Sequence, residues 1–162
     1  QNAILQAKAE GDSVGGVISC YATGLPAGLG DPMFDGVENR LSQALFAIPA
    51  VRGVEFGTGF AASELPGSLH NDAFEMKDGK ITTKTNHHGG VLGGITTGMP
   101  LIVRMAVKPT PSIAMQQKTI SINQMSQADL TICGRHDPCI VPRAVPVMEA
   151  AVACVLYDLL SD

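Results

Sequence analysis

The stretch LIVRMAVK, residues 101–108, has the two-residue period of a β-strand. Arg104 falls on one face of this strand. The opposite face carries four apolar side chains, namely Leu101, Val103, Met105 and Val107. Because a strand with one apolar face must bury that face against another layer, the stretch predicts a sheet that is covered on one side.

One candidate for the covering layer precedes this strand. Between residues 33 and 48, apolar side chains recur at the three- and four-residue spacing of an amphipathic helix. Asp31 and Pro32 suit the cap and the first helical position, and Pro49 suits the end of the run. We therefore expect a helix over residues 33–48.

A second candidate lies near the end of the chain. The stretch VPVMEAAVACVLYDLL, residues 145–160, is apolar nearly all the way round. Proline is favoured at the first position of a helix, so Pro146 is expected to open this one. We expect this helix to be buried on most of its surface.

Other segments add further strands. Residues 13–22, SVGGVISCYA, and residues 51–57, VRGVEFG, have strand composition, and KDGK at residues 77–80 is typical of a hairpin tip. Strands interleaved with two long helices predict an α+β or layered sandwich fold. With 162 residues, 45% of them hydrophobic, we expect one unit over residues 1–162.

Composition narrows the classes of partner. The net charge of −4, without any run of Lys and Arg, gives no basic field for nucleic acid. The longest apolar run, residues 150–157, is shorter than the roughly 20 residues that span a bilayer, so no membrane span is expected. No signal peptide precedes the four cysteines, so reduced thiols and a cytoplasmic location are expected.

The stretch CGRHDPC, residues 133–139, allows two interpretations. The spacing of Cys133 and Cys139 does not match that of zinc sites, so we expect no metal. In the other interpretation the stretch is an anion-binding turn, in which Arg135 offers a planar fork for phosphate or carboxylate. A third possibility is an internal pair between Arg135 and Asp137 that only stiffens the turn.

Two more segments are candidates for binding. In KPTPS, residues 108–112, two prolines hold one cation and two hydroxyls on an extended frame, although a strand terminator with a solvated lysine would have the same sequence. In GGVLGGITTG, residues 89–98, glycines permit close approach to a flat ligand, and a tight bend at a sheet edge is the alternative. The stretch matches neither the dinucleotide nor the Walker fingerprint.

Five blocks together resemble one known family. They are GLPAGLGDPMFD, AVRGVEFGTGF, TNHHGGVLGGITTGMP, VKPTPSI and GRHDPCIVPRAVPVMEA, and they occur in the order and spacing seen in chorismate synthase. The resemblance implies part of a β-α-β sandwich, with antiparallel sheet packed on long helices, and a homotetramer. It also implies 1,4-elimination of phosphate from 5-enolpyruvylshikimate-3-phosphate, with reduced FMN required although no net redox change occurs.

The resemblance also implies roles for individual residues. Asp137 matches the family aspartate proposed to move a proton at the reduced flavin. The implied flavin contacts are Ala50, Gly93, Lys108, Pro109, Thr110, Pro111, Ser112 and Arg135. A flat isoalloxazine suits the close approach that Gly93 permits, and a reduced flavin with negative charge suits Lys108 or Arg135. One departure is His88, which stands where the family has a small residue.

The matching blocks correspond to the C-terminal half of the family sequence. The family's Ser-His-Gly segment and most of its substrate-phosphate arginines lie in the other half, and none of the histidines here is expected to replace them. We expect an enzyme fragment, because the sequence starts without Met inside a family block. We expect it to be inactive alone, because the half that carries the family's acid-base and phosphate-binding residues is absent. The alternative is a free-standing module that binds flavin or is purely structural.

Overall fold

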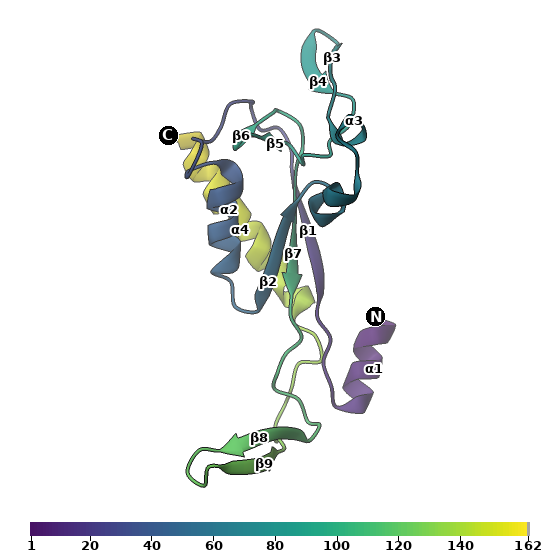
Figure 1. Cartoon of the computed structure of the whole chain (residues 1–162), viewed down its shortest axis with the longest axis vertical. Helices are drawn as coiled ribbons and strands as arrows, with labels where there is room; N and C mark the ends of the chain where they lie inside the picture. Colours follow the sequence, from purple (N-terminus) through teal and green to yellow (C-terminus); the bar gives the residue numbers. More distant parts are fainter. Residues whose placement is uncertain (162) are drawn as a thin grey trace.

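A three-stranded antiparallel sheet forms the centre of the fold in a computed structural model, which describes residues 1–161. Strand β7 (Leu101–Val107) lies between β1 (Gly16–Ala22) and β2 (Val51–Phe56). Helices α2 (Val37–Phe46) and α4 (Val141–Ser161) pack on one face of this sheet (Figure 1). The structure confirms the α+β class, with antiparallel sheet packed on helices.

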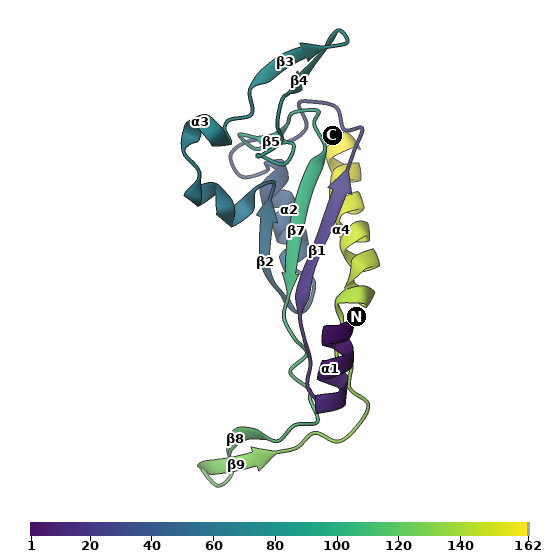
Figure 2. The same ribbon diagram turned by 90° about the vertical axis from the view of Figure 1, so that its right-hand side faces the viewer.

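The remaining elements lie around this centre. They are α1 (Asn2–Glu10), the 3₁₀ helix η1 (Gly59–Glu64), α3 (Gly67–His70) and three hairpins, β3 (Phe74–Lys77) with β4 (Lys80–Thr83), β5 (Val91–Leu92) with β6 (Ile95–Thr96), and β8 (Gln117–Ser121) with β9 (Ser126–Leu130). Figures 1 and 2 show that the β3–β4 and β8–β9 hairpins extend beyond opposite ends of the sheet. The KDGK tip is confirmed, with Asp78 and Gly79 both at positive φ. The β8–β9 hairpin was not predicted.

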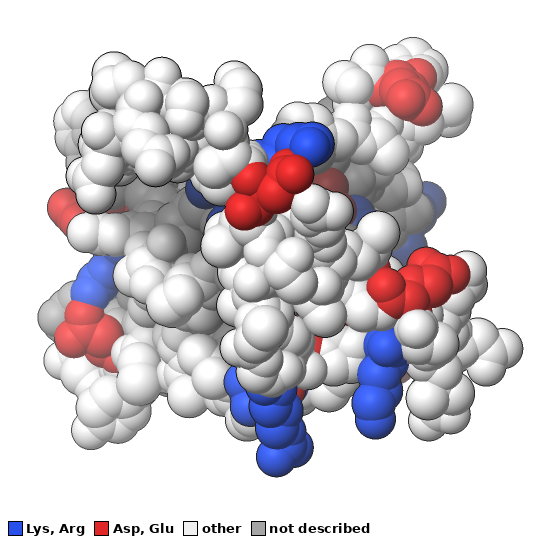
Figure 3. Space-filling model, turned by 90° about the horizontal axis from the view of Figure 1, so that it is seen from below, with Lys and Arg blue, Asp and Glu red and all other residues white. Residues whose placement is uncertain are grey.

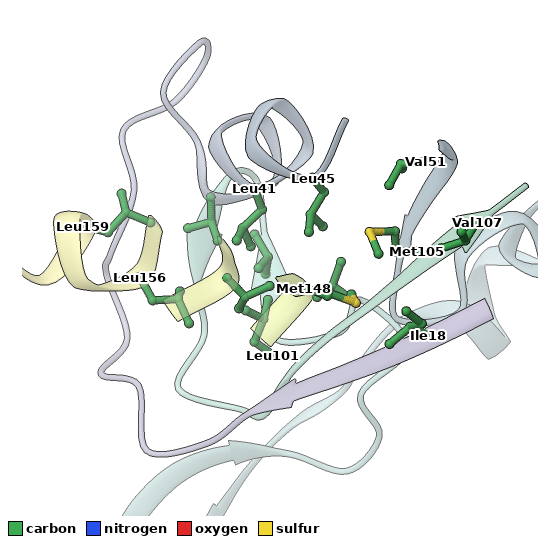
Figure 4. Packing of buried hydrophobic residues seen from close by; sticks show 14 residues of the cluster. Ile18, Leu41, Leu45, Val51, Leu101, Met105, Val107, Met148, Leu156 and Leu159 are labelled. Atoms are coloured by element: carbon green, nitrogen blue, oxygen red, sulfur yellow. The ribbon is translucent and has the colours of Figure 1, made fainter. Parts of the chain in front are cut away.

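The alternation of buried and partly exposed side chains along β7 gives the sheet one apolar face, on which the core forms. Residues of this strand are buried at every second position, as the sequence predicts. Opposite them, Leu41 and Leu45 of α2 and Met148 of α4 are fully buried. These side chains point toward one another between the sheet and the helices (Figure 4). Burial of each such side chain contributes about 1.5–3 kcal/mol, so this layer holds the helices on the sheet.

The start of α2 differs from the expectation. The helix begins at Val37 rather than near Met33, and Met33 and Phe34 are 77% and 83% exposed. Asp31 and Asp35 instead bridge each other through their backbones, which closes a turn before the helix. The apolar spacing extended past the helix start because Phe34, although exposed, stands three residues before Val37 and so falls in phase with the helix.

Helix α4 differs in both start and burial. It begins at Val141, so Pro146 lies inside it rather than at its first position. Only one stripe is buried, formed by Met148, Val152, Leu156 and Leu159. The expectation of burial on most of its surface is therefore wrong for this chain, because nothing within residues 1–161 covers its other side.

By length and composition α4 is also a candidate membrane span. It has 21 residues, a mean hydropathy of 1.6 over its most apolar window, and 22% of that window is buried. The length argument from residues 150–157 was therefore too strict. Because the buried stripe packs against α2 and β1, we assign α4 to the core of the fold.

Candidate functional site

Residues 108–112 leave the sheet at the carboxyl end of β7, beside the end of α2. The Lys108 amide donates a hydrogen bond to the carbonyl of Ala50 over 2.9 Å. Ala50 has a φ of 71°, a left-handed conformation that few residues other than glycine adopt. This contact places Ala50 against residues 108–112. The resemblance assigns Ala50 and this segment to one ligand.

Residues 108–112 are also tied to residues 133–139. The Ser112 hydroxyl oxygen lies 3.1 Å from Nδ1 of His136. A short segment links them on the other side, since the Ser13 hydroxyl donates to the Thr110 carbonyl over 2.6 Å and the Val14 amide donates to the Pro138 carbonyl over 2.8 Å. Two segments that are well separated in the sequence therefore form one local structure.

The charged groups of residues 133–139 are arranged differently from the predicted pair. Asp137 pairs with Arg143 of α4, with 2.8 Å between Oδ2 and Nη2, rather than with Arg135. Arg135 is exposed and has no hydrogen bond or ion pair within residues 1–161. The internal pair that would only stiffen the turn is therefore not present, and Arg135 is available to an anion.

The polar groups of residues 108–112 leave donors for a ligand. The Thr110 hydroxyl oxygen is buried and has no hydrogen-bond partner among the described residues. A buried hydroxyl without a partner is costly, and such groups occur where a ligand or water completes the site. With the exposed Lys108, this hydroxyl fits a ligand that is both polar and anionic.

Gly93 lies elsewhere. It forms the turn between β5 and β6 with Gly94, at φ of 62° and 83°, and no atom lies within 4 Å of the position that its Cβ would take. The same hairpin region contacts the amino end of β7, where the Ile102 amide donates to the Gly89 carbonyl over 2.9 Å. Seven residues of β7, about 23 Å at ~3.3 Å each, separate this end from Lys108. This chain does not bring Gly93 to the other candidate residues.

Sequence reasoning missed Asp72, which holds the segment before the glycine turn. Its side chain is 7% exposed and accepts hydrogen bonds from the His87 amide (2.8 Å), the His88 amide (3.0 Å) and the Thr85 hydroxyl (2.7 Å). Burial acts to raise the pKa of Asp72, but these hydrogen bonds and the nearby His88 together lower it below its ordinary value. Nothing in the local sequence of Asp72 signals this role, because its partners follow 13–16 residues later.

His70 stacks on His87 and meets His88 edge-on, with ring centroids 5.7 Å and 4.7 Å apart. Burial raises the pKa of the neighbouring Glu38, and the charge of His88 opposes that rise.

Within the part of the chain that the structure describes, no group of three or more His, Cys, Asp or Glu is placed to hold a metal ion. The four cysteines are free thiols.

The surface at this end carries mixed charge. Figure 3, viewed from the end that carries β8 and β9, shows Lys and Arg side chains beside Asp and Glu rather than in one basic field. One such pair joins Lys118 to Asp129 across the hairpin, with 2.6 Å between Nζ and Oδ1. An anionic ligand would therefore be held by individual cations such as Arg135.

Comparison with known proteins agrees with the sequence blocks. The family model described as chorismate synthase matches residues 1–160. The chain belongs to the chorismate synthase family. It is 56% identical over 156 residues to chorismate synthase of Dehalococcoides mccartyi, covering 96% of this chain and 43% of the relative. It is 54% identical over 153 residues to that of Thermococcus kodakarensis, covering 94% and 43%.

A solved structure shows the same relation. A crystal structure of chorismate synthase superposes with a TM-score of 0.79 at 34% sequence identity, over 98% of this chain and 40% of that one. The chain thus spans about two fifths of the length of the curated relatives it matches. Under half of a chorismate synthase polypeptide is therefore represented here.

Proposed function

We propose that the full-length protein containing this segment is a chorismate synthase, which eliminates phosphate from 5-enolpyruvylshikimate-3-phosphate in a 1,4 sense and requires reduced FMN. The observation that carries the proposal is the family match over residues 1–160. The meeting of residues 108–112 with residues 135–137 supports it, because these are segments that the sequence blocks assign to one flavin. A cytoplasmic homotetramer belongs to the same proposal.

The chemistry of the residues present fits FMN. When bound, reduced FMN would supply reversible one-electron chemistry, which fits an elimination that has no net redox change. In our proposal Lys108 and Arg135 hold its negative charge, since both are exposed cations beside the site. Thr110 gains a partner for its buried hydroxyl, and Pro109, Pro111 and Ser112 complete the frame. Ala50 presents its backbone at the edge of that frame.

Asp137 is proposed to move a proton near the reacting centre. Its Oδ2 is held by Arg143 over 2.8 Å, and its side chain is 39% exposed, so the other carboxylate oxygen can reach a ligand. An arginine partner fixes the orientation of a carboxylate, which suits a group that must move a proton at one defined atom. Arg143 acts here as a positioning residue.

Gly93 is also proposed to contact the flavin, although it lies apart from the other candidate residues. Its open surroundings and positive φ suit close approach by a flat ring. Because it lies at the other end of β7, it can contact a flavin only together with parts of the protein outside this segment. The uncovered side of α4, which exposes Val147, Tyr157 and Leu160, supports the presence of such parts.

Two substitutions in the full-length protein test the division of roles. Arg135→Ala should weaken FMN binding by roughly 10- to 100-fold, the scale of a lost charge-assisted hydrogen bond. Asp137→Asn should keep FMN affinity within a few-fold but slow single-turnover decay of the substrate-dependent flavin transient by about 100-fold or more.

Asp129→Asn is the matched control, because it makes the same change in an ion-paired carboxylate on the β8–β9 hairpin. It should leave both FMN affinity and decay unchanged. Decay in Asp137→Asn that matches this control would remove Asp137 from the chemistry. An unchanged FMN affinity in Arg135→Ala would remove Arg135 from the site.

A further inference from the structure

Ser112 and His136 form a pair whose hydrogen-bond directions can be worked out from the geometry. Nδ1 of His136 lies 3.1 Å from the Ser112 hydroxyl oxygen, and Nε2 lies 3.0 Å from the carbonyl oxygen of Ile132. A carbonyl oxygen can only accept, so Nε2 carries a hydrogen and donates it. In the neutral ring the other nitrogen then has no hydrogen and must accept.

The hydroxyl of Ser112 therefore donates to Nδ1 of His136. A hydroxyl has one hydrogen and two lone pairs, so Ser112 has only lone pairs left for a ligand. We infer that His136 is a positioning residue that fixes Ser112 as a hydrogen-bond acceptor, so that Ser112 recognises an N–H or O–H group of the bound flavin. This inference rests on the proposed function, which places the flavin against residues 108–112.

The local backbone supports a fixed arrangement. The contact from His136 to Ile132 closes a loop of residues 132–136, inside which Gly134 adopts a φ of 143° that other residues rarely adopt. On the other side, Pro109 and Pro111 restrict the backbone that presents Ser112. Both His136 and Ser112 are half-buried, so water competes weakly for their contact. The hydroxyl is thus oriented before a ligand arrives.

Thr110 provides a contrast two residues earlier. Its hydroxyl has no partner within residues 1–161, so it can rotate and either donate to or accept from a ligand. FMN offers both kinds of group, with the imide N–H and ribityl hydroxyls as donors and the ring carbonyls and phosphate as acceptors. Of these two hydroxyls, only that of Ser112, whose hydrogen is already donated to His136, discriminates between the two kinds of group. The pair therefore acts on the orientation of the flavin as well as on its affinity.

The tautomer can be measured directly without any substitution in the pair. In ¹⁵N spectra of the full-length protein labelled at histidine, His136 should show a protonated Nε2 and an unprotonated Nδ1, with and without FMN. The His136 signals are assigned by their loss in His136→Asn. A protonated Nδ1 in the neutral ring would overturn the inference, and this readout does not depend on the proposed activity.

Two substitutions of His136 test separately the acceptor Nδ1, which faces Ser112, and the donor Nε2, which faces the Ile132 carbonyl. The side-chain oxygen of asparagine can occupy the place of Nδ1, so His136→Asn should keep FMN affinity within about two-fold. The side-chain amide of glutamine reaches the place of Nε2 but offers Ser112 no acceptor. His136→Gln should therefore weaken FMN binding by roughly three- to ten-fold, the scale of one hydrogen bond, and Ser112→Ala should do the same.

The double variant decides whether His136 acts through Ser112. Ser112→Ala with His136→Gln should bind FMN no more weakly than either single variant, whereas independent effects would multiply. Ser63→Ala and His70→Gln are controls, since Ser63 donates only to the Phe60 carbonyl in η1 and His70 lies in α3. Multiplying effects, or loss of affinity in His136→Asn with retention in His136→Gln, would refute the positioning role. If the wild-type protein binds no FMN while the tautomer is as stated, the proposed function fails and the pair stands.

Discussion

Removing the carboxylate of Asp72 should loosen residues 86–90 by an amount that the structure allows to be estimated. Oδ1 accepts hydrogen bonds from the Thr85 hydroxyl and the His87 amide, and Oδ2 accepts one from the His88 amide. At about 1 kcal/mol for each bond, Asp72→Ala should cost about 3 kcal/mol. Asp72→Asn keeps one oxygen but turns the other atom into a donor that faces the His88 amide, so we expect a cost of about 1–2 kcal/mol.

The effect should depend on pH. The pKa of Asp72 in the folded protein lies below its ordinary value of 3.8, because the amides of His88 and His87 and the Thr85 hydroxyl outweigh the opposing effect of burial. The ionised carboxylate therefore stabilises the fold above about pH 3.8, and this contribution is lost as the pH falls through the folded-state pKa. The difference between wild type and Asp72→Asn should be full at neutral pH and shrink on acidification.

Hydrogen exchange of the His87 and His88 amides in the full-length protein measures this local opening. Denaturant unfolding at neutral and acidic pH measures the wider effect. Asp78→Asn, the same substitution at an exposed hairpin tip, should change neither. Exchange in Asp72→Asn equal to that in Asp78→Asn, or a difference that grows on acidification, would refute the role given to Asp72.

Three further outcomes are expected. In denaturant unfolding of the 162-residue chain, Met148→Ala should lower the free energy of unfolding by about 2–5 kcal/mol, because Met148 is fully buried. Leu160→Ala, at a site that is 52% exposed, should lower it much less. Equal losses would contradict the packing shown in Figure 4. Metal analysis should find no stoichiometric zinc, and a chelator should leave Tm unchanged, since Cys133 and Cys139 are free thiols; about one zinc per chain would overturn this. The isolated 162-residue chain should form no chorismate in an anaerobic assay with reduced FMN, because relatives are more than twice as long; turnover above the reagent blank would show that the catalytic groups are misassigned.

Short-range patterns in the sequence predicted the centre of the fold well. The alternation of residues 101–108 produced β7 with its apolar face buried, because burial on one face imposes a two-residue period that any reader of the sequence can detect. The end of α2 near Pro49 was also predictable. Its start was not, since the backbone bridge between Asp31 and Asp35 outweighed the helical spacing of Phe34 with Val37.

Contacts between residues far apart in the sequence could not be predicted from local patterns. The burial of α4 was overestimated because apolar composition does not show which faces of a helix have a neighbour, and within residues 1–161 the buried residues of α4 are Met148, Val152, Leu156 and Leu159. The contact between Ser112 and His136 joins residues 24 positions apart, and the ion pair between Asp137 and Arg143 depends on where α4 begins. The sequence blocks identified the candidate residues, but the structure was needed to show that β7 separates Gly93 from Ala50 and Lys108.

The most direct test is an anaerobic assay of the full-length protein with 5-enolpyruvylshikimate-3-phosphate. We expect chorismate and phosphate to form in equal amounts when reduced FMN is present, without net oxidation of the flavin, and neither product to form when it is omitted. Equal release without flavin, or binding of FMN without any release of phosphate, would contradict the proposal that this protein is a flavin-dependent chorismate synthase.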